Sequence, residues 1–226
     1  MNTNITDAQI QIEQQAYLTK VFGWMCIGLI TTGLVALTVV QYNMYINPIL
    51  FFIAILLEFF LVYRISRYVM QVSLTMAMGM FIGFSALNGF TLSGLFYVYT
   101  SESLTSTFLI AASIFAFMAV YGYSTKRDLS KMGSFMYMGL FGILIAMIVN
   151  IFMQSSAMYL AISCIGVVIF TGLTAYDVQK ILQMNIIGNA GTDEDTKEAI
   201  RGALTLYLDF INLFIMLLRL LGTRRN

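Results

Sequence analysis

Long apolar stretches separated by short polar connections make up most of the chain after residue 20. A helix needs about 20 apolar residues to cross a bilayer, and the chain has six such runs and a more polar seventh. They lie at about residues 21–41, 46–63, 69–99, 106–123, 133–153, 157–182 and 199–221. The alternation over about ten residues that marks a membrane barrel is absent. The pattern therefore predicts an all-α polytopic membrane protein.

Two of these runs depart from a simple spanning helix. The third is too long for one straight helix, and its segment 88–94, Asn-Gly-Phe-Thr-Leu-Ser-Gly, predicts a local break or a close helix contact. The seventh carries Asp209, Asn212 and Arg219. Because these side chains are costly in lipid, the run spans, folds back or lies inside the bundle, and the pattern leaves these alternatives open.

The third run also has a ridge of small residues at helical spacing. The ridge comprises Gly79, Gly83, Ala86, Gly89 and Ser93, and its first two members form a GxxxG motif that permits close approach of two helices. We expect the ridge to pack within one chain, with a homodimer face as the alternative. A monomer is therefore expected, with a homo-oligomer as the second option.

The positions of Lys and Arg predict the orientation, since positively charged connections stay in the cytoplasm. The first, third and fifth connections have no Lys or Arg. Nine lie before the first run, or in or beside the second, fourth and sixth connections: Lys20, Arg64, Arg67, Lys126, Arg127, Lys131, Lys180, Lys197 and Arg201. The N-terminus is therefore expected in the cytoplasm. Arg224 and Arg225 favour a cytoplasmic C-terminal tail, whereas the length of the seventh run favours a full crossing.

These predictions divide the chain into three parts. Residues 1–19 form a cytoplasmic N-terminal tail, residues 20–221 a seven-helix transmembrane domain, and residues 222–226 a C-terminal tail. The first 19 residues are polar, and no small-residue cleavage site follows a short apolar core. No cleavable signal is therefore expected.

Composition supports a membrane protein and excludes several kinds of chemistry. Of the 226 residues 59% are apolar and 10% charged, whereas a soluble domain has about 25% charged residues. The chain has no His, which excludes Ser-His-Asp and Cys-His catalysis and the HExxH zinc site. No Gly-rich nucleotide loop occurs. We therefore expect neither an enzyme nor a permanently bound cofactor, and we do not expect nucleic acid as a partner.

Three carboxylates lie inside apolar runs, where an ionisable residue indicates a functional site. At a rise of 1.5 Å per residue, Glu58 lies roughly 10 Å from the cytoplasmic surface. On the same basis Asp177 lies at about 8 to 10 Å and Asp209 at about 12 to 16 Å. All three could therefore occupy one layer.

Polar residues follow helical spacing around the two aspartates. They are Arg201, Thr205, Asp209 and Asn212 on the last run, and Thr174, Asp177 and Lys180 on the sixth. Such stripes must face each other, other polar groups or water. Two carboxylates in one low-dielectric site should share a proton, so the spacing predicts a pH-sensitive site.

Arg64 and Arg67 each allow two interpretations. Either side chain can extend to the interface without a specific partner, or one of them pairs with Asp177 and competes with a bound cation. Glu58 likewise lies near a helix end and can reach water there.

Two segments around the aspartates carry specific motifs: residues 171–180, Thr-Gly-Leu-Thr-Ala-Tyr-Asp-Val-Gln-Lys, and residues 202–214, Gly-Ala-Leu-Thr-Leu-Tyr-Leu-Asp-Phe-Ile-Asn-Leu-Phe. Together with two further segments they resemble the Bax inhibitor-1 (transmembrane Bax inhibitor motif, TMBIM) family, in its bacterial YccA-like branch. The others are residues 89–93, Gly-Phe-Thr-Leu-Ser, and residues 121–129, Tyr-Gly-Tyr-Ser-Thr-Lys-Arg-Asp-Leu. The four segments together extend over most of the chain.

The resemblance implies a seven-helix bundle with the C-terminal helix at its centre and a pH-sensitive calcium leak through it. It implies that Asp177 and Asp209 form a di-aspartyl sensor and bind the metal ion. It also implies a latch between Asp177 and an arginine of the second helix, for which Arg64 and Arg67 are both candidates, and a place for Glu58 along the ion path.

The leading hypothesis is therefore a multi-pass protein of the bacterial inner membrane in which Asp177 and Asp209 gate a slow leak of Ca²⁺. Its partners would be the lipid bilayer, Ca²⁺ and protons. One alternative, which family analogy supplies, is an interaction protein that restrains a membrane-bound AAA quality-control protease. Another is an intramembrane aspartyl protease, but the Gly-x-Gly-Asp motif of the presenilin type is missing and the only proline is Pro48.

Overall fold

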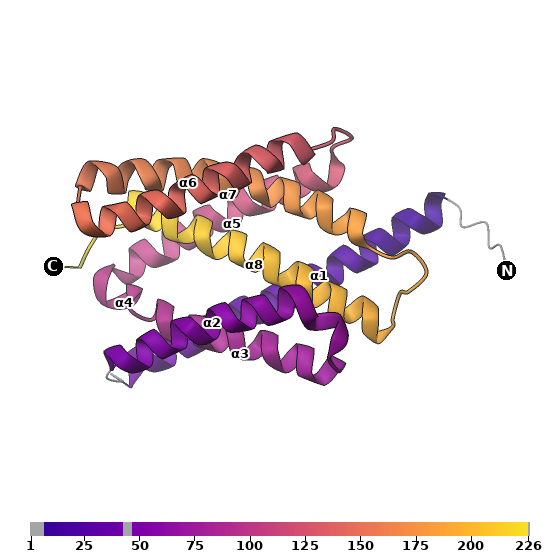
Figure 1. Ribbon diagram of the computed structural model, residues 1–226, viewed down its shortest axis with the longest axis horizontal. Coiled ribbons are helices and arrows are strands. Elements are labelled where there is room, and N and C mark those ends of the chain that lie inside the picture. The colour runs from indigo at the N-terminus through magenta and orange to yellow at the C-terminus, as the bar shows by residue number, and fades with distance from the viewer. Residues whose placement is uncertain (1–6, 43–46, 226) are drawn as a thin grey trace. The chain divides into compact units, whose positions relative to one another are not determined.

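The computed structural model describes residues 7–42 and 47–225, so residues 1–6 and 226 of the two predicted tails lie outside the described part. The described residues form helices and one isolated β-bridge, and no strand. Figure 1 shows the helices in chain order. They are α1 (Asp7–Gln41), α2 (Pro48–Tyr68), the 3₁₀ turn η1 (Val69–Gln71), α3 (Leu74–Leu92), α4 (Leu95–Val98), α5 (Ser101–Ser124), α6 (Ser130–Met153), α7 (Ser156–Met184) and α8 (Asp193–Leu221).

The prediction of an all-α protein with seven spans is confirmed. Within the described residues, seven helical segments are long and apolar enough to cross a membrane when α3 and α4 are counted as one. The most apolar stretch of α8 is 61% buried, against 6% for α6 and 11% for α2. The last helix is therefore the most enclosed of the seven, as the central position predicted for it requires.

Two helices begin earlier than the apolar runs predict, because polar residues extend them. α1 begins at Asp7, so the polar residues 7–19 are helical and continuous with the first span. α8 begins at Asp193 rather than near residue 199, and its first turn is acidic, which suits the positive end of a helix dipole. The Thr192 hydroxyl accepts a hydrogen bond from the Asp195 backbone N–H at 3.2 Å and caps this end.

The predicted break in the third run is present. α3 ends at Leu92 and α4 begins at Leu95. A Cβ at Gly89 would lie 2.5 Å from the carbonyl oxygen of Thr32, so this glycine allows α3 to pack closely against α1. At Gly79 and Gly83 a Cβ would meet no described atom within 4 Å. The small-residue ridge thus packs inside the chain at its Gly89 end and not at its GxxxG motif.

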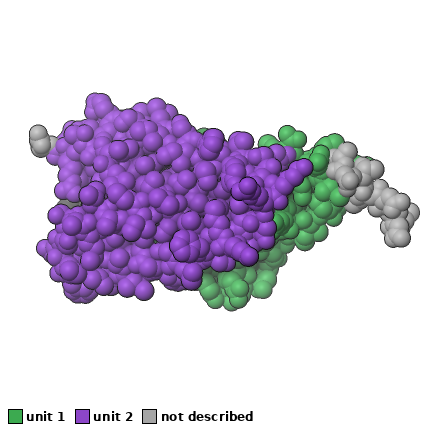
Figure 2. Space-filling view, turned by 90° about the horizontal axis from the view of Figure 1, so that it is seen from above, with its two compact units in different colours: residues 1–95, 181–207 green, residues 96–180, 208–226 purple. Residues whose placement is uncertain are grey.

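The chain divides into two compact units, coloured separately in Figure 2. Unit 1 comprises residues 1–95 and 181–207, and unit 2 comprises residues 96–180 and 208–226. The first half of α8 therefore belongs to unit 1 and its second half to unit 2.

Unit 1 is built on α3, against which α1 and α2 both pack. In Figure 1, α2 and α3 lie side by side. The α1 contact is close at Gly28, where a Cβ would lie 2.9 Å from the ring of Phe81. From α8, the Tyr207 ring meets Phe84 edge to face at 5.3 Å between centroids. Glycine contacts and aromatic packing therefore join α1, α3 and α8 in this unit.

Unit 2 contains α5, α6, most of α7 and the second half of α8. A Cβ at Gly122 of α5 would lie 2.2 Å from the Ala175 carbonyl oxygen of α7. At Gly133 of α6 a Cβ would lie 2.4 Å from the ring of Tyr176. These two glycines let α5 and α6 approach α7 closely at the two residues that precede Asp177.

The C-terminal segment pairs with the third connection of the chain. Thr100 donates its N–H to the Thr223 carbonyl at 3.2 Å, and Arg225 donates to the Val98 carbonyl at 2.9 Å. This connection carries no Lys or Arg and was predicted to lie opposite the cytoplasm. The pairing, together with 29 uninterrupted helical residues in α8, favours a full crossing over a segment that folds back.

Substitution of Gly122 tests the contact between α5 and α7. Gly122→Ala places a methyl group where Ala175 leaves no room, and we expect a loss of about 1 to 3 kcal/mol in the free energy of unfolding. Thermal unfolding in detergent measures it. Gly142→Ala in α6 is the matched control, because a Cβ there meets no described atom within 4 Å. Equal stability of the two variants would contradict the contact.

Candidate functional site

Two buried carboxylates meet in unit 2. Asp177 lies on α7 and Asp209 on α8, and their side chains are only 1% and 6% exposed. The two groups lie close enough to interact directly with each other. The two aspartates therefore lie near each other in this unit, and their role as a sensor or metal site stays a prediction.

The backbone groups of the two aspartates are hydrogen-bonded within their helices, so only the carboxylate side chains need further hydrogen-bond partners. Asp177 and Asp209 both lie well inside long helices, α7 and α8. Backbone groups inside a helix are satisfied by the helix itself, even in lipid. The polar atoms that remain to be satisfied are thus the four carboxylate oxygens.

Tyr137 of α6 satisfies Asp177. Its hydroxyl donates to both carboxylate oxygens of Asp177, each at 3.2 Å. Its ring also meets the ring of Tyr176 edge to face, with 6.0 Å between centroids. A phenol at this place holds the Asp177 carboxylate in one orientation.

Asp209 is less completely satisfied. Its Oδ2 atom is buried and has no hydrogen-bond partner among the described residues. A buried polar atom without a partner costs free energy unless a proton, water or ion satisfies it. Asp209 therefore supplies the open position of the pair.

The pair can bind a proton or a cation, but it is not a complete metal cage. Within the described part of the chain, no three side chains of His, Cys, Asp and Glu gather as metal ligands. Ca²⁺ takes six to eight oxygen ligands, so a Ca²⁺ ion at the pair would keep water or take other oxygens as well.

Glu58 has its own set of partners in unit 1. Its two carboxylate oxygens accept hydrogen bonds from Thr91 at 2.8 Å and from Asn88 at 3.2 Å, both on α3. Asn88 in turn accepts from the hydroxyl of Tyr207 at 2.8 Å, which is 2.6 Å from the Thr32 hydroxyl. A polar network thus joins α2, α3, α8 and α1. Whether Glu58 shares a layer with the two aspartates stays a prediction.

The two latch candidates lie at the end of α2 in unit 1. The Arg64 guanidinium lies 5.3 Å from the ring centroid of Tyr68, and Arg67 is exposed in the last turn of the helix. Pairing of either with Asp177 stays a prediction.

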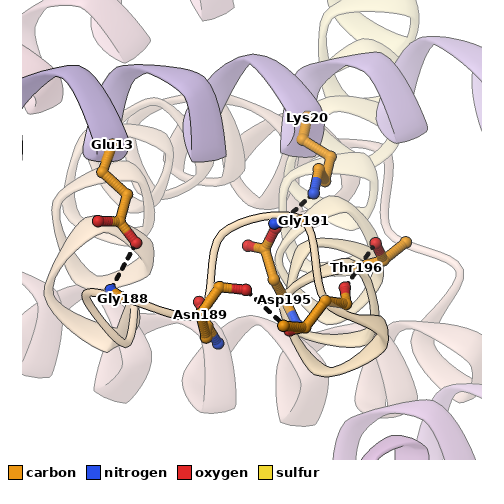
Figure 3. Close-up of polar contacts among 8 residues, drawn as sticks. Glu13, Lys20, Gly188, Asn189, Gly191, Asp195 and Thr196 are labelled. Carbon is orange, nitrogen blue, oxygen red and sulfur yellow. Dashed lines mark hydrogen bonds and ion pairs between the residues drawn. The ribbon is translucent and has the colours of Figure 1, made fainter.

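The connection between α7 and α8 is bonded to the first turns of α1, as Figure 3 shows. Glu13 accepts the Gly188 N–H at 2.7 Å. Lys20 forms an ion pair with Asp195, which also accepts the Gly191 N–H at 3.0 Å. The N-terminal helix and the sixth connection therefore meet at one end of unit 1, as expected for two segments predicted to lie on the same side.

Sequence reasoning missed Tyr137 and the network around Asn88. A single tyrosine in an apolar run carries no signal of its partner, since which face of α6 meets Asp177 depends on tertiary packing. The stripe containing Lys180 was visible in the sequence. The environment of that lysine, between the rings of Tyr137 and Tyr176, was not.

These features define a polytopic helical membrane protein with a buried pair of carboxylates in its transmembrane region. Residues 14–226 match the family described as "Inhibitor of apoptosis-promoting Bax1". The chain therefore belongs to the Bax inhibitor-1 family, as the motifs predicted.

Several bacterial relatives match nearly the whole chain. The inner membrane protein YbhL of Escherichia coli K12 is 43% identical over 217 residues, which cover 93% of each chain. An uncharacterized protein of Borreliella burgdorferi is 47% identical over 215 residues, again 93% of each chain. The uncharacterized protein RP147 of Rickettsia prowazekii is 42% identical over 221 residues, 93% of this chain and 90% of its own.

Removal of the Tyr137 hydroxyl tests its bond to Asp177. A hydrogen bond to a charged group contributes about 1.5 to 3 kcal/mol, so Tyr137→Phe should lower the free energy of unfolding by about that amount. Denaturant titration in mixed micelles measures it, with Tyr123→Phe at an exposed position as the control. In an Asp177→Asn background the cost should shrink. An equal cost in both backgrounds would show that the hydroxyl does not act through Asp177.

Proposed function

We propose that this protein is a pH-sensitive calcium leak channel of the bacterial inner membrane, gated by Asp177 and Asp209. The observation that carries the proposal is the meeting of two buried carboxylates inside membrane-spanning helices, one with an unpartnered oxygen. Intramembrane carboxylates that face each other are typical of ion and proton pathways.

The pH sensitivity follows from the charge of the pair. Two adjacent buried carboxylates repel each other when both are ionised, so they share a proton. When both are protonated the pair is neutral and loses its attraction for Ca²⁺ and for a latch arginine. When protons leave, the negative charge attracts a cation again. Conductance should therefore change over the pH range in which the pair titrates.

The relatives support the location. One relative is named as an inner membrane protein, and the chain has seven segments able to span a membrane among its described residues. We propose the same membrane for this protein, with the N-terminus in the cytoplasm. We further propose that Glu58 lies along the ion path and that Arg64 or Arg67 forms the latch to Asp177.

We propose no catalytic activity. The names of the relatives reported above describe an inner membrane protein and uncharacterized proteins, and none of them describes an enzyme. An aspartyl protease would also use two aspartates, and cleavage of a model transmembrane substrate that Asp209→Asn abolishes would support that alternative.

Calcium flux into proteoliposomes across a pH series tests the proposal. The wild-type flux should change with pH, whereas Asp177→Asn and Asp209→Asn should each alter that dependence because one titratable carboxyl remains, and the double variant should remove it. Glu102→Gln, which neutralises an exposed carboxylate in the first turn of α5, should behave as wild type. An unchanged pH dependence in both aspartate variants would refute the proposal.

A second role, restraint of a membrane-bound AAA protease, would use a different surface. The polar extension of α1 exposes Ile12 to 68%, which is an apolar contact point on an otherwise polar helix. Ile12→Asp should weaken capture of a purified AAA protease by the full chain at least severalfold, because a charge replaces a buried apolar contact. Gln15→Glu, also at an exposed position, is the control. Undiminished capture by Ile12→Asp would remove this surface from consideration.

A further inference from the structure

A lysine on the helix that carries Asp177 lies over two aromatic rings. The Lys180 ammonium is 5.9 Å from the ring centroid of Tyr137 and 5.6 Å from that of Tyr176. Both distances are within the range in which a cation is attracted to the face of an aromatic ring. Lys180 is also partly buried.

Helical spacing places this charge near one member of the pair. Lys180 follows Asp177 by three residues and Tyr176 by four, which are the separations of neighbours on one helix face. Its positive charge acts on Asp177, whereas the interactions of Asp209 within the site are with Asp177. One ammonium therefore accompanies two carboxylates.

The net charge of Asp177, Asp209 and Lys180 differs according to whether a divalent cation is bound. When the two carboxylates share one proton the pair carries a single negative charge, which the ammonium balances. A divalent cation at the pair would make the total positive if the ammonium stayed in place. Because an unbalanced charge is costly in a low-dielectric site, arrival of a divalent cation favours departure of the ammonium.

We propose that Lys180 is a tethered competitor that neutralises the carboxylate pair when it is empty and leaves when a divalent cation binds. The inference rests on the proposed ion-binding function and adds a residue that sets the affinity of the site. Lys180 would thus make Ca²⁺ binding weaker than the two aspartates alone would make it.

The two tyrosines hold the ammonium near the pair without direct contact with the carboxylates. Tyr137 contacts both groups, since its hydroxyl donates to Asp177 and its ring faces Lys180. The ring of Tyr176 faces the same ammonium. Among the described residues Lys180 forms no ion pair with Asp177, so its charge acts on the pair from its place over the rings, and an incoming cation need break no direct contact.

Binding of radioactive calcium to the full chain in detergent micelles tests the inference. Lys180→Met removes the charge and keeps the apolar stem, so the half-saturating Ca²⁺ concentration should fall by roughly tenfold, as expected for loss of one nearby charge. Lys180→Arg keeps the charge and its attraction to the rings, and should bind Ca²⁺ as wild type does. Lys131→Met, at an exposed position of α6, should leave binding unchanged.

The outcomes separate this inference from the function on which it rests. If Asp177→Asn and Asp209→Asn lose calcium binding while Lys180→Met binds as wild type does, the tethered competitor is refuted and the cation site stands. If the aspartate variants bind as wild type does, the cation site itself fails. If Lys180→Arg shows the same tighter binding as Lys180→Met, the lysine acts through packing rather than charge, and the inference is wrong.

Discussion

A carboxylate inside a membrane-spanning helix must find its partners within the protein, because lipid supplies none. The Tyr137 hydroxyl donates hydrogen bonds to both carboxylate oxygens of Asp177, and Asp209 interacts with Asp177. Close glycine contacts at Gly122 and Gly133 bring α5 and α6 against α7 at this level. The packing of unit 2 and the chemistry of its site therefore depend on one requirement, the satisfaction of two buried acids.

The same requirement shapes unit 1 with different chemistry. There Glu58 is satisfied by neutral donors, Asn88 and Thr91, and the network continues to Tyr207. Neutral partners leave the carboxylate without a competing charge, whereas Asp177 has a second acid and the ammonium of Lys180 nearby. α8 supplies Tyr207 to one unit and Asp209 to the other.

Much of this architecture could be predicted from the sequence, because apolar runs and the cost of charge in lipid act locally. The seven spans, the break after Leu92 and the candidate aspartates all follow from such local signals. The start of α1 at Asp7 could not be predicted in this way, because polar residues can extend a helix without changing its apolar pattern. Tyr137 could not be found either, because the partner of a buried acid is set by which helix faces pack together.

The central claim is that Asp177 and Asp209 bind a proton and a cation in competition. Release of protons on addition of Ca²⁺ to the weakly buffered protein in micelles measures this most directly. The account predicts release of about one proton per chain near the midpoint of titration of the pair, and none from the double variant Asp177→Asn with Asp209→Asn. Calcium binding without proton release, or equal release from the double variant, would contradict it.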